Sequence, residues 1–362
     1  MKSYKLSNHD KVINLTEKTN YIKNDNLLKT LHSTKCKIDK CNLKKWELAK
    51  KFHNIYEYIY TSSNTNKNMC NVIPISRSYF KILEILYRFN LFKDNSYFSC
   101  IAEGPGGFIQ CIHDTYQKKN LNVKKITSIT LVSDDKKVPY WNINILNNSK
   151  NNIQYGIDKT GNIYNKENAI DYINNHNEKC YLITSDGGFD FSDNYNNQEN
   201  SSIQLLFCEI YIALNLQEKG GSFIIKMFDI LNIKTIQLLY ILYLHYDEIY
   251  FYKPDTSRLS NTEKYIVCKG FTNINRDIID MMNNSYDNLN NFNIYIPKSF
   301  LDEINSFNIN FIKNQIQNIN LVLKIVYSNK HIQNKPTQQQ IIEARKWCEK
   351  YNLELNNNFI FT

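Results

Sequence analysis

Long apolar segments are missing from this 362-residue sequence, which has no stretch approaching 18 uninterrupted apolar residues. The nearest is the run 236–244, which is too short to span a membrane. The chain opens MKSYKLSNHD, without the apolar segment of a secretory signal peptide. We therefore expect a soluble, intracellular protein that does not bind membranes, and we take the cytoplasm as its location.

The cysteine pattern indicates neither a disulfide framework nor a zinc site. The nine cysteines are odd in number, scattered and without a CxxC pair. His32, Cys36 and Cys41 lie close together but lack a fourth zinc ligand. We expect reduced, mostly buried thiols and no bound metal.

Glycine and proline are scarce, with 10 and 6 residues, and no internal repeat is visible. Because glycine is rare elsewhere, its clusters mark turns that require a conformation or a close approach that a Cβ would prevent. Two clusters hold half of the glycines: Gly104, Gly106 and Gly107 in the first, and Gly187 and Gly188 in the second.

Positive charge is in surplus, with 44 Lys and Arg against 35 Asp and Glu, a net charge of +9. A basic surface attracts polyanions because each neutralised phosphate releases counterions, so nucleic acid is the natural candidate partner. A composition that simply favours lysine would give the same surplus. The charge alone therefore leaves the partner open.

Polar and apolar segments predict three regions: an N-terminal arm and helix (1–69), a central domain (70–272) and an accessory C-terminal segment with helices (273–362). Residues 1–35 are polar and rich in Asn and Lys, so we expect them to be weakly ordered. Apolar residues at three- and four-residue spacing predict an amphipathic helix over 43–60.

Short apolar segments alternate with helical patterns in the central region. This alternation is typical of an α/β doubly wound fold, a mainly parallel sheet with helices on both faces. The segments expected to form strands are 97–102, 126–133, 181–185, 222–227, 248–252 and 265–269. The helices expected between them are 79–89, 108–116, 202–216 and 234–244.

The first glycine cluster lies in FSCIAEGPGGFIQCI (98–112), a strand, a tight turn and the start of a helix. Such a turn lets a ligand approach the carboxyl end of the strand. The spacing is not GxGxxG, no phosphate-binding lysine follows, and Glu103 would repel a pyrophosphate. The motif therefore disfavours a nucleotide phosphate site and is compatible with a sulfonium amino-acid cofactor, although glycines can also serve the turn geometry alone.

Charged residues mark the ends of two further expected strands. YLITSDGGFDF (181–191) places Asp186 after a strand, and GGSFIIKMFD (220–229) places Lys226 near the end of another. A lysine in a buried strand needs a partner, unless it marks the point where the strand emerges into water. Lys81, in an expected helix, and Glu263, before an expected strand, are unremarkable when taken singly.

Five motifs in this order, SRSYFK, AEGPGGF, SDGG, GGSFIIK and KPDTSR followed by SNTEKYIV, resemble those of the FtsJ/RrmJ-like family of ribose 2′-O-methyltransferases. The resemblance covers residues 70–272. It implies a Rossmann-like methyltransferase fold with a mainly parallel seven-stranded sheet and S-adenosyl-L-methionine as the cofactor. The AEGPGGF variant is similar to the cap methyltransferases of viruses and eukaryotes, which implies capped mRNA as substrate and a capping-machinery protein as a partner.

The composition, rich in Asn, Ile, Lys and Tyr, suggests an AT-rich genome such as that of a large DNA virus or a protist. For a virus, the viral factory or the virion would be alternative locations.

The resemblance also implies a Lys-Asp-Lys-Glu tetrad, which falls here on Lys81, Asp186, Lys226 and Glu263. Lys226, held neutral or placed to hydrogen-bond the developing oxyanion, would accept the proton of the 2′-hydroxyl. Lys81 and desolvation would depress the pKa of Lys226, and the two acids would orient the lysines.

Cofactor and RNA contacts follow by analogy with the family. The expected cofactor contacts are Glu103, Gly104, Pro105, Gly106, Gly107, Phe108, Asp134, Asp135, Asp158 and Asp186. Asp134 and Asp135 would meet the ribose hydroxyls and Asp158 the adenine edge, or all three cap helices and loops. The expected RNA contacts are Arg77, Lys253 and Arg258. Aromatic side chains would stack on bases, and the N-terminal arm would extend the phosphate-binding face.

Three rival functions stay open at this point. The first is ribose methylation of rRNA or tRNA. The second is a catalytically inactive RNA-binding subunit of a capping complex, which the intact tetrad disfavours. The third is an NAD-type dehydrogenase, which the absent GxGxxG motif disfavours.

Overall fold

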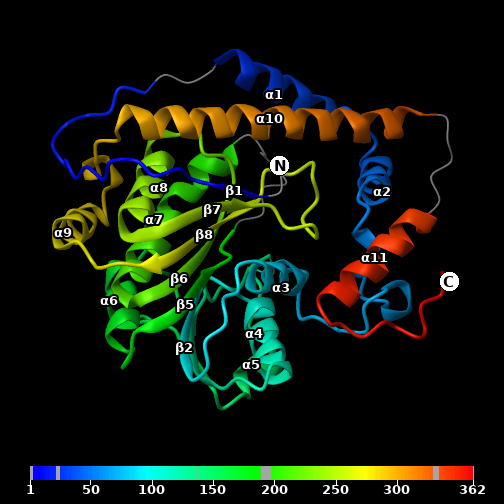
Figure 1. Cartoon of the computed structure of the whole chain (residues 1–362), viewed down its shortest axis with the longest axis horizontal. Helices are drawn as coiled ribbons and strands as arrows, with labels where there is room; N and C mark the ends of the chain where they lie inside the picture. Colours follow the sequence, from blue (N-terminus) through cyan, green and yellow to red (C-terminus); the bar gives the residue numbers. More distant parts are fainter. Residues whose placement is uncertain (1–2, 22–24, 136, 189–196, 329–333, 362) are drawn as a thin grey trace.

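The computed structural model describes residues 3–21, 25–135, 137–188, 197–328 and 334–361. It contains an eight-stranded mixed sheet (Figure 1) with the order β1-β7-β8-β6-β5-β2-β3-β4. The strands are β1 (Ser3–Lys5), β2 (Ser96–Ile101), β3 (Val123–Ile129), β4 (Asn151–Gln154), β5 (Cys180–Ser185), β6 (Gln217–Met227), β7 (Tyr246–Tyr252) and β8 (Lys264–Phe271).

Strands β4, β3, β2, β5 and β6 are parallel, whereas β8 is antiparallel to both β6 and β7. The chain order reverses between β2 and β5, and ligands of open α/β sheets bind where the order reverses. All six strands whose position the sequence predicted are present. Strand β4 has only partly buried residues, so its apolar pattern was too weak to be recognised.

Helices cover both faces of the sheet, as predicted. Parallel strands that are buried on both faces carry apolar residues that point to both faces. In β6, successive side chains pack into the two hydrophobic cores on opposite faces of the sheet. Ile224 packs with α3 and α4, whereas Phe223 and Ile225 pack with α6, α7 and α8. The helices are α1 (Asp25–Asp39), α2 (Leu43–His53), α3 (Ser78–Arg88), α4 (Gly107–Lys118), α5 (Ile143–Leu146), α6 (Lys166–Asn174), α7 (Gln198–Leu216), α8 (Ile233–His245), α9 (Arg276–Ser285), α10 (Lys298–Tyr327) and α11 (Gln338–Lys350).

The prediction of a weakly ordered N-terminal arm was wrong for two segments. Strand β1 pairs antiparallel with β7, with Ser3 opposite Tyr252 and Lys5 opposite Tyr250. Backbone hydrogen bonds at a sheet edge do not need an apolar side-chain pattern, so the polar sequence concealed this strand. Helix α1 is the second such segment, and it lies along α10 (Figure 1).

The N-terminal and C-terminal segments pack against each other, and we call residues 43–73 and 338–361 the terminal module. The Gln340 amide donates to the carbonyls of Lys51 (2.9 Å) and Asn54 (2.8 Å). The helix predicted over 43–60 ends at His53, because Asn54 adopts extended backbone, and a short 3-10 helix η1 (Glu57–Ile59) follows. The helical C-terminal extension is present as predicted.

Among the described residues, no helix is both long enough and apolar enough to cross a membrane.

Candidate active site

A cavity of about 780 Å³ lies at the carboxyl ends of β2, β5 and β6. This position follows from the reversal of chain order between β2 and β5. Residues from all five motifs line it: Ser76, Ser78, Glu103, Gly104, Pro105, Asp186, Gly187, Gly188, Lys226 and Glu263. The sequence motifs therefore converge on one space.

The first glycine cluster lies in the turn that follows β2, and of its three glycines only Gly104 belongs to the described lining of the cavity. Gly106 has φ +108°, and a Cβ built on it would lie 2.7 Å from Cγ1 of Ile145. A Cβ on Gly104 would lie 2.7 Å from the carbonyl oxygen of Pro139. Both positions thus require glycine, for left-handed backbone in one case and for close packing in the other.

The four tetrad residues form two ion pairs beside the cavity. Nζ of Lys81, on α3, lies 2.8 Å from Oε2 of Glu263, which precedes β8. Nζ of Lys226, on β6, lies 3.2 Å from Oδ1 of Asp186, which follows β5, and 2.6 Å from its carbonyl oxygen. All four side chains are less than a fifth exposed.

The carboxylates keep Lys226 charged. Burial by itself disfavours its ammonium form, but Asp186 and Glu263 outweigh burial, so the pKa of Lys226 is raised above its usual value. The expectation that Lys81 and desolvation would depress this pKa was therefore wrong. For Glu263, burial is outweighed by Lys81, Lys226 and Lys253, and its pKa falls to about 2. The opposite charges that lie close to each group therefore decide the direction of both pKa shifts.

Two hydroxyl groups orient the acids. The Tyr265 hydroxyl donates to Oδ1 of Asp186 at 2.7 Å, and the Ser257 hydroxyl donates to Oε1 of Glu263 at 2.8 Å. The sequence prediction missed both. The alternation of side chains along a strand offered a signal for Tyr265, because it stands two residues after Glu263.

Lys253 is not a surface contact for RNA, which corrects the prediction. It is 7% exposed, and its ammonium group donates to the carbonyl oxygens of Asn261 (3.0 Å) and Glu263 (2.6 Å). Burial lowers its pKa to about 7, against the opposing effect of Glu263. Its role in the structure is to hold the loop 253–263, which carries Glu263, in a closed turn.

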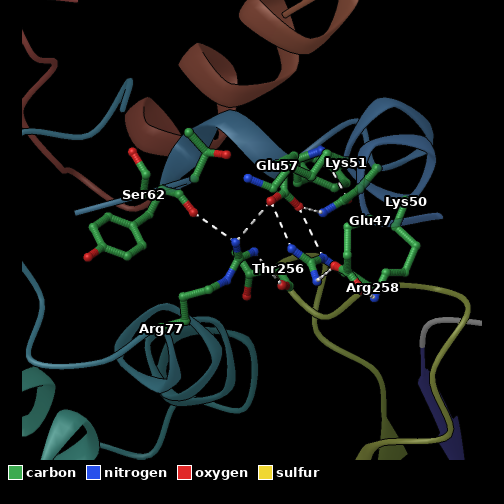
Figure 2. A network of polar contacts seen from close by, with 12 residues as sticks. Glu47, Lys50, Lys51, Glu57, Ser62, Arg77, Thr256 and Arg258 are labelled. Carbon is green, nitrogen blue, oxygen red and sulfur yellow. Dashed lines mark hydrogen bonds and ion pairs between the residues drawn. The ribbon is translucent and has the colours of Figure 1, made fainter. Parts of the chain in front are cut away.

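Arg77 and Arg258 both contact the buried carboxylate of Glu57 (Figure 2). Their side chains remain 31% and 28% exposed. Their contact with RNA stays a prediction.

The predicted cofactor contacts divide into two groups. Glu103, Gly104, Pro105, Asp135 and Asp186 line the cavity. The others stand outside its described lining: Gly106, Gly107, Phe108, Asp134 and Asp158.

Two of the residues outside the lining, Phe108 and Asp158, make contacts with other parts of the protein. Phe108 is buried, with its ring centroid 6.1 Å from that of Tyr265. The Asp158 carboxylate accepts hydrogen bonds from Thr160 N (2.9 Å) and Asn168 Nδ2 (2.8 Å). The capping alternative therefore describes Asp158 better than the adenine contact, because local donors occupy its oxygens.

The cavity fits S-adenosylmethionine, a cofactor with cationic sulfonium and ammonium groups. Glu103 is buried, and its Oε1 has no hydrogen-bond partner among the described residues. Burial raises the pKa of Glu103 well above its usual value, and Asp186 raises it further. Because burial without a partner is costly for a carboxyl group, a cationic ligand with N–H donors would suit this position.

Residues 74–271 match the model of a family described as FtsJ-like methyltransferase. The chain is 30% identical over 287 residues to cap-specific mRNA (nucleoside-2′-O-)-methyltransferase 1 of Dictyostelium discoideum, covering 73% of this chain and 37% of that protein. It is 31% identical over 211 residues to the 1A enzyme of that name from Caenorhabditis briggsae, covering 56% and 24%. Against the human methyltransferase 1 it is 32% identical over 190 residues, covering 48% and 21%. The chain thus spans less than two fifths of the length of these relatives.

Proposed function

Because the chain belongs to the FtsJ-like methyltransferase family, we propose that it transfers the methyl group of S-adenosylmethionine to a ribose 2′-hydroxyl of RNA. The observation that carries the proposal is the meeting of two lysine–carboxylate pairs, Lys81–Glu263 and Lys226–Asp186, beside one cavity. We further propose capped mRNA as the substrate, with methylation next to the cap. The names of the relatives support this choice.

Methyl transfer is an in-line displacement in which the 2′-oxygen attacks the methyl carbon while the carbon–sulfur bond breaks. When bound, S-adenosylmethionine supplies this electrophilic methyl group on a positively charged sulfur. The hydroxyl must lose its proton and develop negative charge, which an unassisted hydroxyl does poorly at neutral pH.

Lys226 stabilises that negative charge in its ammonium form, because its raised pKa keeps it protonated. We propose that the Asp186 carboxylate, which lines the cavity and lies 3.2 Å from the same ammonium, is the base that takes the hydroxyl proton. The charges of Lys81 and Glu263 neutralise each other, and their ion pair holds α3 next to the loop that precedes β8. Of the two states that the sequence left open for Lys226, this proposal keeps the hydrogen bond to the developing oxyanion, and it assigns the proton to Asp186 instead.

The proposal is tested by incubating the full chain with methyl-labelled S-adenosylmethionine and matched capped and uncapped RNAs. Nuclease digestion then identifies the labelled nucleoside. We expect the label on a 2′-oxygen of the capped RNA. Label on a base, or no transfer to any RNA, would contradict the proposed reaction, whereas equal transfer to structured uncapped RNA would point to an rRNA or tRNA substrate.

An intracellular, cytoplasmic location is part of the proposal, supported by the nine cysteines, which are free thiols in the structure. A capping-machinery protein as partner also stays a prediction.

A further inference from the structure

Glu57 is a fully buried carboxylate that lies outside the family segment 74–271, in the terminal module. It accepts hydrogen bonds from Arg77 (3.3 Å), from two nitrogens of Arg258 (3.0 and 3.3 Å) and from the Asn54 amide (3.0 Å) (Figure 2). Burial opposes its ionisation, but Arg77 and Arg258 outweigh burial and lower its pKa. Glu57 is therefore an anion at neutral pH, shared by two cations.

The two arginines lie in the two elements that carry the Lys81–Glu263 pair: Arg77 at the start of α3, and Arg258 in the loop 253–263. Arg77 is the N-cap residue of α3, four residues before Lys81. Arg258 lies in the loop 253–263, five residues before Glu263. A shift of either arginine would therefore change the 2.8 Å approach of Lys81 to Glu263.

The same loop is also held from within the methyltransferase domain. Glu84, on α3, accepts hydrogen bonds from the backbone N–H groups of Asp255 (2.7 Å) and Thr256 (2.9 Å). Glu84 thus fixes the start of the loop to α3. Arg258 lies beyond that clamp, and its other carboxylate neighbour is the exposed Glu47, at 3.8 Å.

We propose that Glu57 is a positioning residue of the methyl-transfer reaction, which holds α3 and the loop 253–263 together through Arg77 and Arg258. The inference rests on the proposed function and deepens it, since it makes the terminal module part of the reaction centre. Removing the charge of Glu57 leaves two partly buried guanidinium groups that repel each other without a shared anion. The part of the loop beyond the Glu84 contacts then shifts away from α3, and the ion pair between Lys81 and Glu263 is lost.

The test compares Glu57→Gln, which keeps the shape and removes the charge, with Glu47→Gln, which removes an exposed carboxylate near the same arginine. We expect Glu57→Gln to lower kcat about tenfold or more. The KM for S-adenosylmethionine and the affinity for S-adenosylhomocysteine should change less than about twofold, because the loop borders the tetrad rather than the glycine turn. Glu47→Gln should behave like the wild type, and Glu57→Asp should recover part of kcat.

Hydrogen–deuterium exchange of peptides covering 253–263 supplies a readout that does not need activity. Exchange should increase in Glu57→Gln and remain at the wild-type level in Glu47→Gln. Unchanged kcat and unchanged exchange would overturn the proposal. So would a change confined to the KM for RNA, which would make the arginines substrate contacts instead.

If Glu57→Gln does not fold, Arg258→Gln tests the same link from the loop side, with the same expected fall in kcat and rise in exchange. A wild-type chain that methylates no RNA would refute the proposed function. In that case the exchange comparison still decides whether Glu57 holds the loop.

Discussion

Nζ of Lys81 lies 2.8 Å from Oε2 of Glu263, although the two residues are 182 positions apart in the chain. Helix α3 supplies the lysine from one face of the sheet, and the loop before β8 supplies the acid. Buried ion pairs of this kind contribute little net stability. Removal of one partner leaves the other charge buried without a partner, which lowers the free energy of unfolding by about 3–5 kcal/mol. The pair therefore serves the geometry of the site more than the stability of the fold.

Lys226→Ala should abolish methyl transfer and leave cofactor binding largely intact. The substitution removes the cation that stabilises the developing oxyanion, an effect worth about 10²- to 10³-fold in kcat. Calorimetry with S-adenosylhomocysteine and a radiometric turnover assay measure the two properties separately. Lys219→Ala, at an exposed position of the same strand, is the control. Wild-type turnover in the Lys226 variant would refute its role.

Gly106→Val should block cofactor binding. Its φ of +108° and the 2.7 Å approach of a Cβ to Ile145 would strain the turn and displace Glu103, Gly104 and Pro105, which line the cavity. Gly220→Val provides a matched control, because Gly220 also has positive φ (+77°) but its Cβ would meet nothing within 4 Å. Titration calorimetry should show loss of affinity in the first variant alone. Equal affinities in both would remove the glycine turn from the cofactor site.

Tyr265→Phe should lower kcat modestly, about two- to tenfold, because the hydroxyl that orients Asp186 is worth about 1 kcal/mol. Tyr246→Phe removes the hydroxyl of another buried tyrosine, which donates to Gln217 at the far end of the sheet. Both variants should lose similar stability in denaturant titrations, but only Tyr265→Phe should lose activity. A parallel loss of activity in both would make the Tyr265 effect one of stability alone.

Lys253 should impose a pH dependence on stability above neutrality. Its folded-state pKa of about 7 lies below the ordinary value of 10.5, so the unfolded chain binds more protons between these limits. Stability therefore rises with pH across about pH 7 to 10.5, by at most about 1.4 kcal/mol per pH unit from this group. Urea titrations of the wild type and Lys253→Met at several pH values measure the difference. A wild-type slope retained in the variant would assign it to other groups.

The local sequence identified the motifs and six of the eight described strands, and the resemblance to the family indicated the type of chemistry. The short apolar segments of β2, β5 and β6 follow from burial on both faces, and the glycine turn follows from backbone that only glycine adopts easily. The resemblance to the family added the grouping of Lys81, Asp186, Lys226 and Glu263, which no spacing along the chain could provide.

Features that depend on distant partners could not be predicted in this way. The sequence predicted Lys253 as a contact for RNA, whereas in the structure its ammonium group is enclosed by its own loop. Strand β1 has a polar sequence, and its pairing with the backbone of β7 leaves no apolar pattern to recognise. Likewise, the anion that binds Arg77 and Arg258 comes from Glu57, which carries no motif of its own.

By itself, the sequence determined where six of the eight described strands and the glycine turns lie along the chain, and which residue types are available for methyl transfer, because both depend on neighbours along the chain. Only the tertiary structure decided that Lys226 stays charged, that Lys253 is enclosed and that Glu57 reaches the loop of Glu263. Charge state and accessibility depend on burial and on which opposite charges lie within a few ångströms, and the folded chain alone sets those distances.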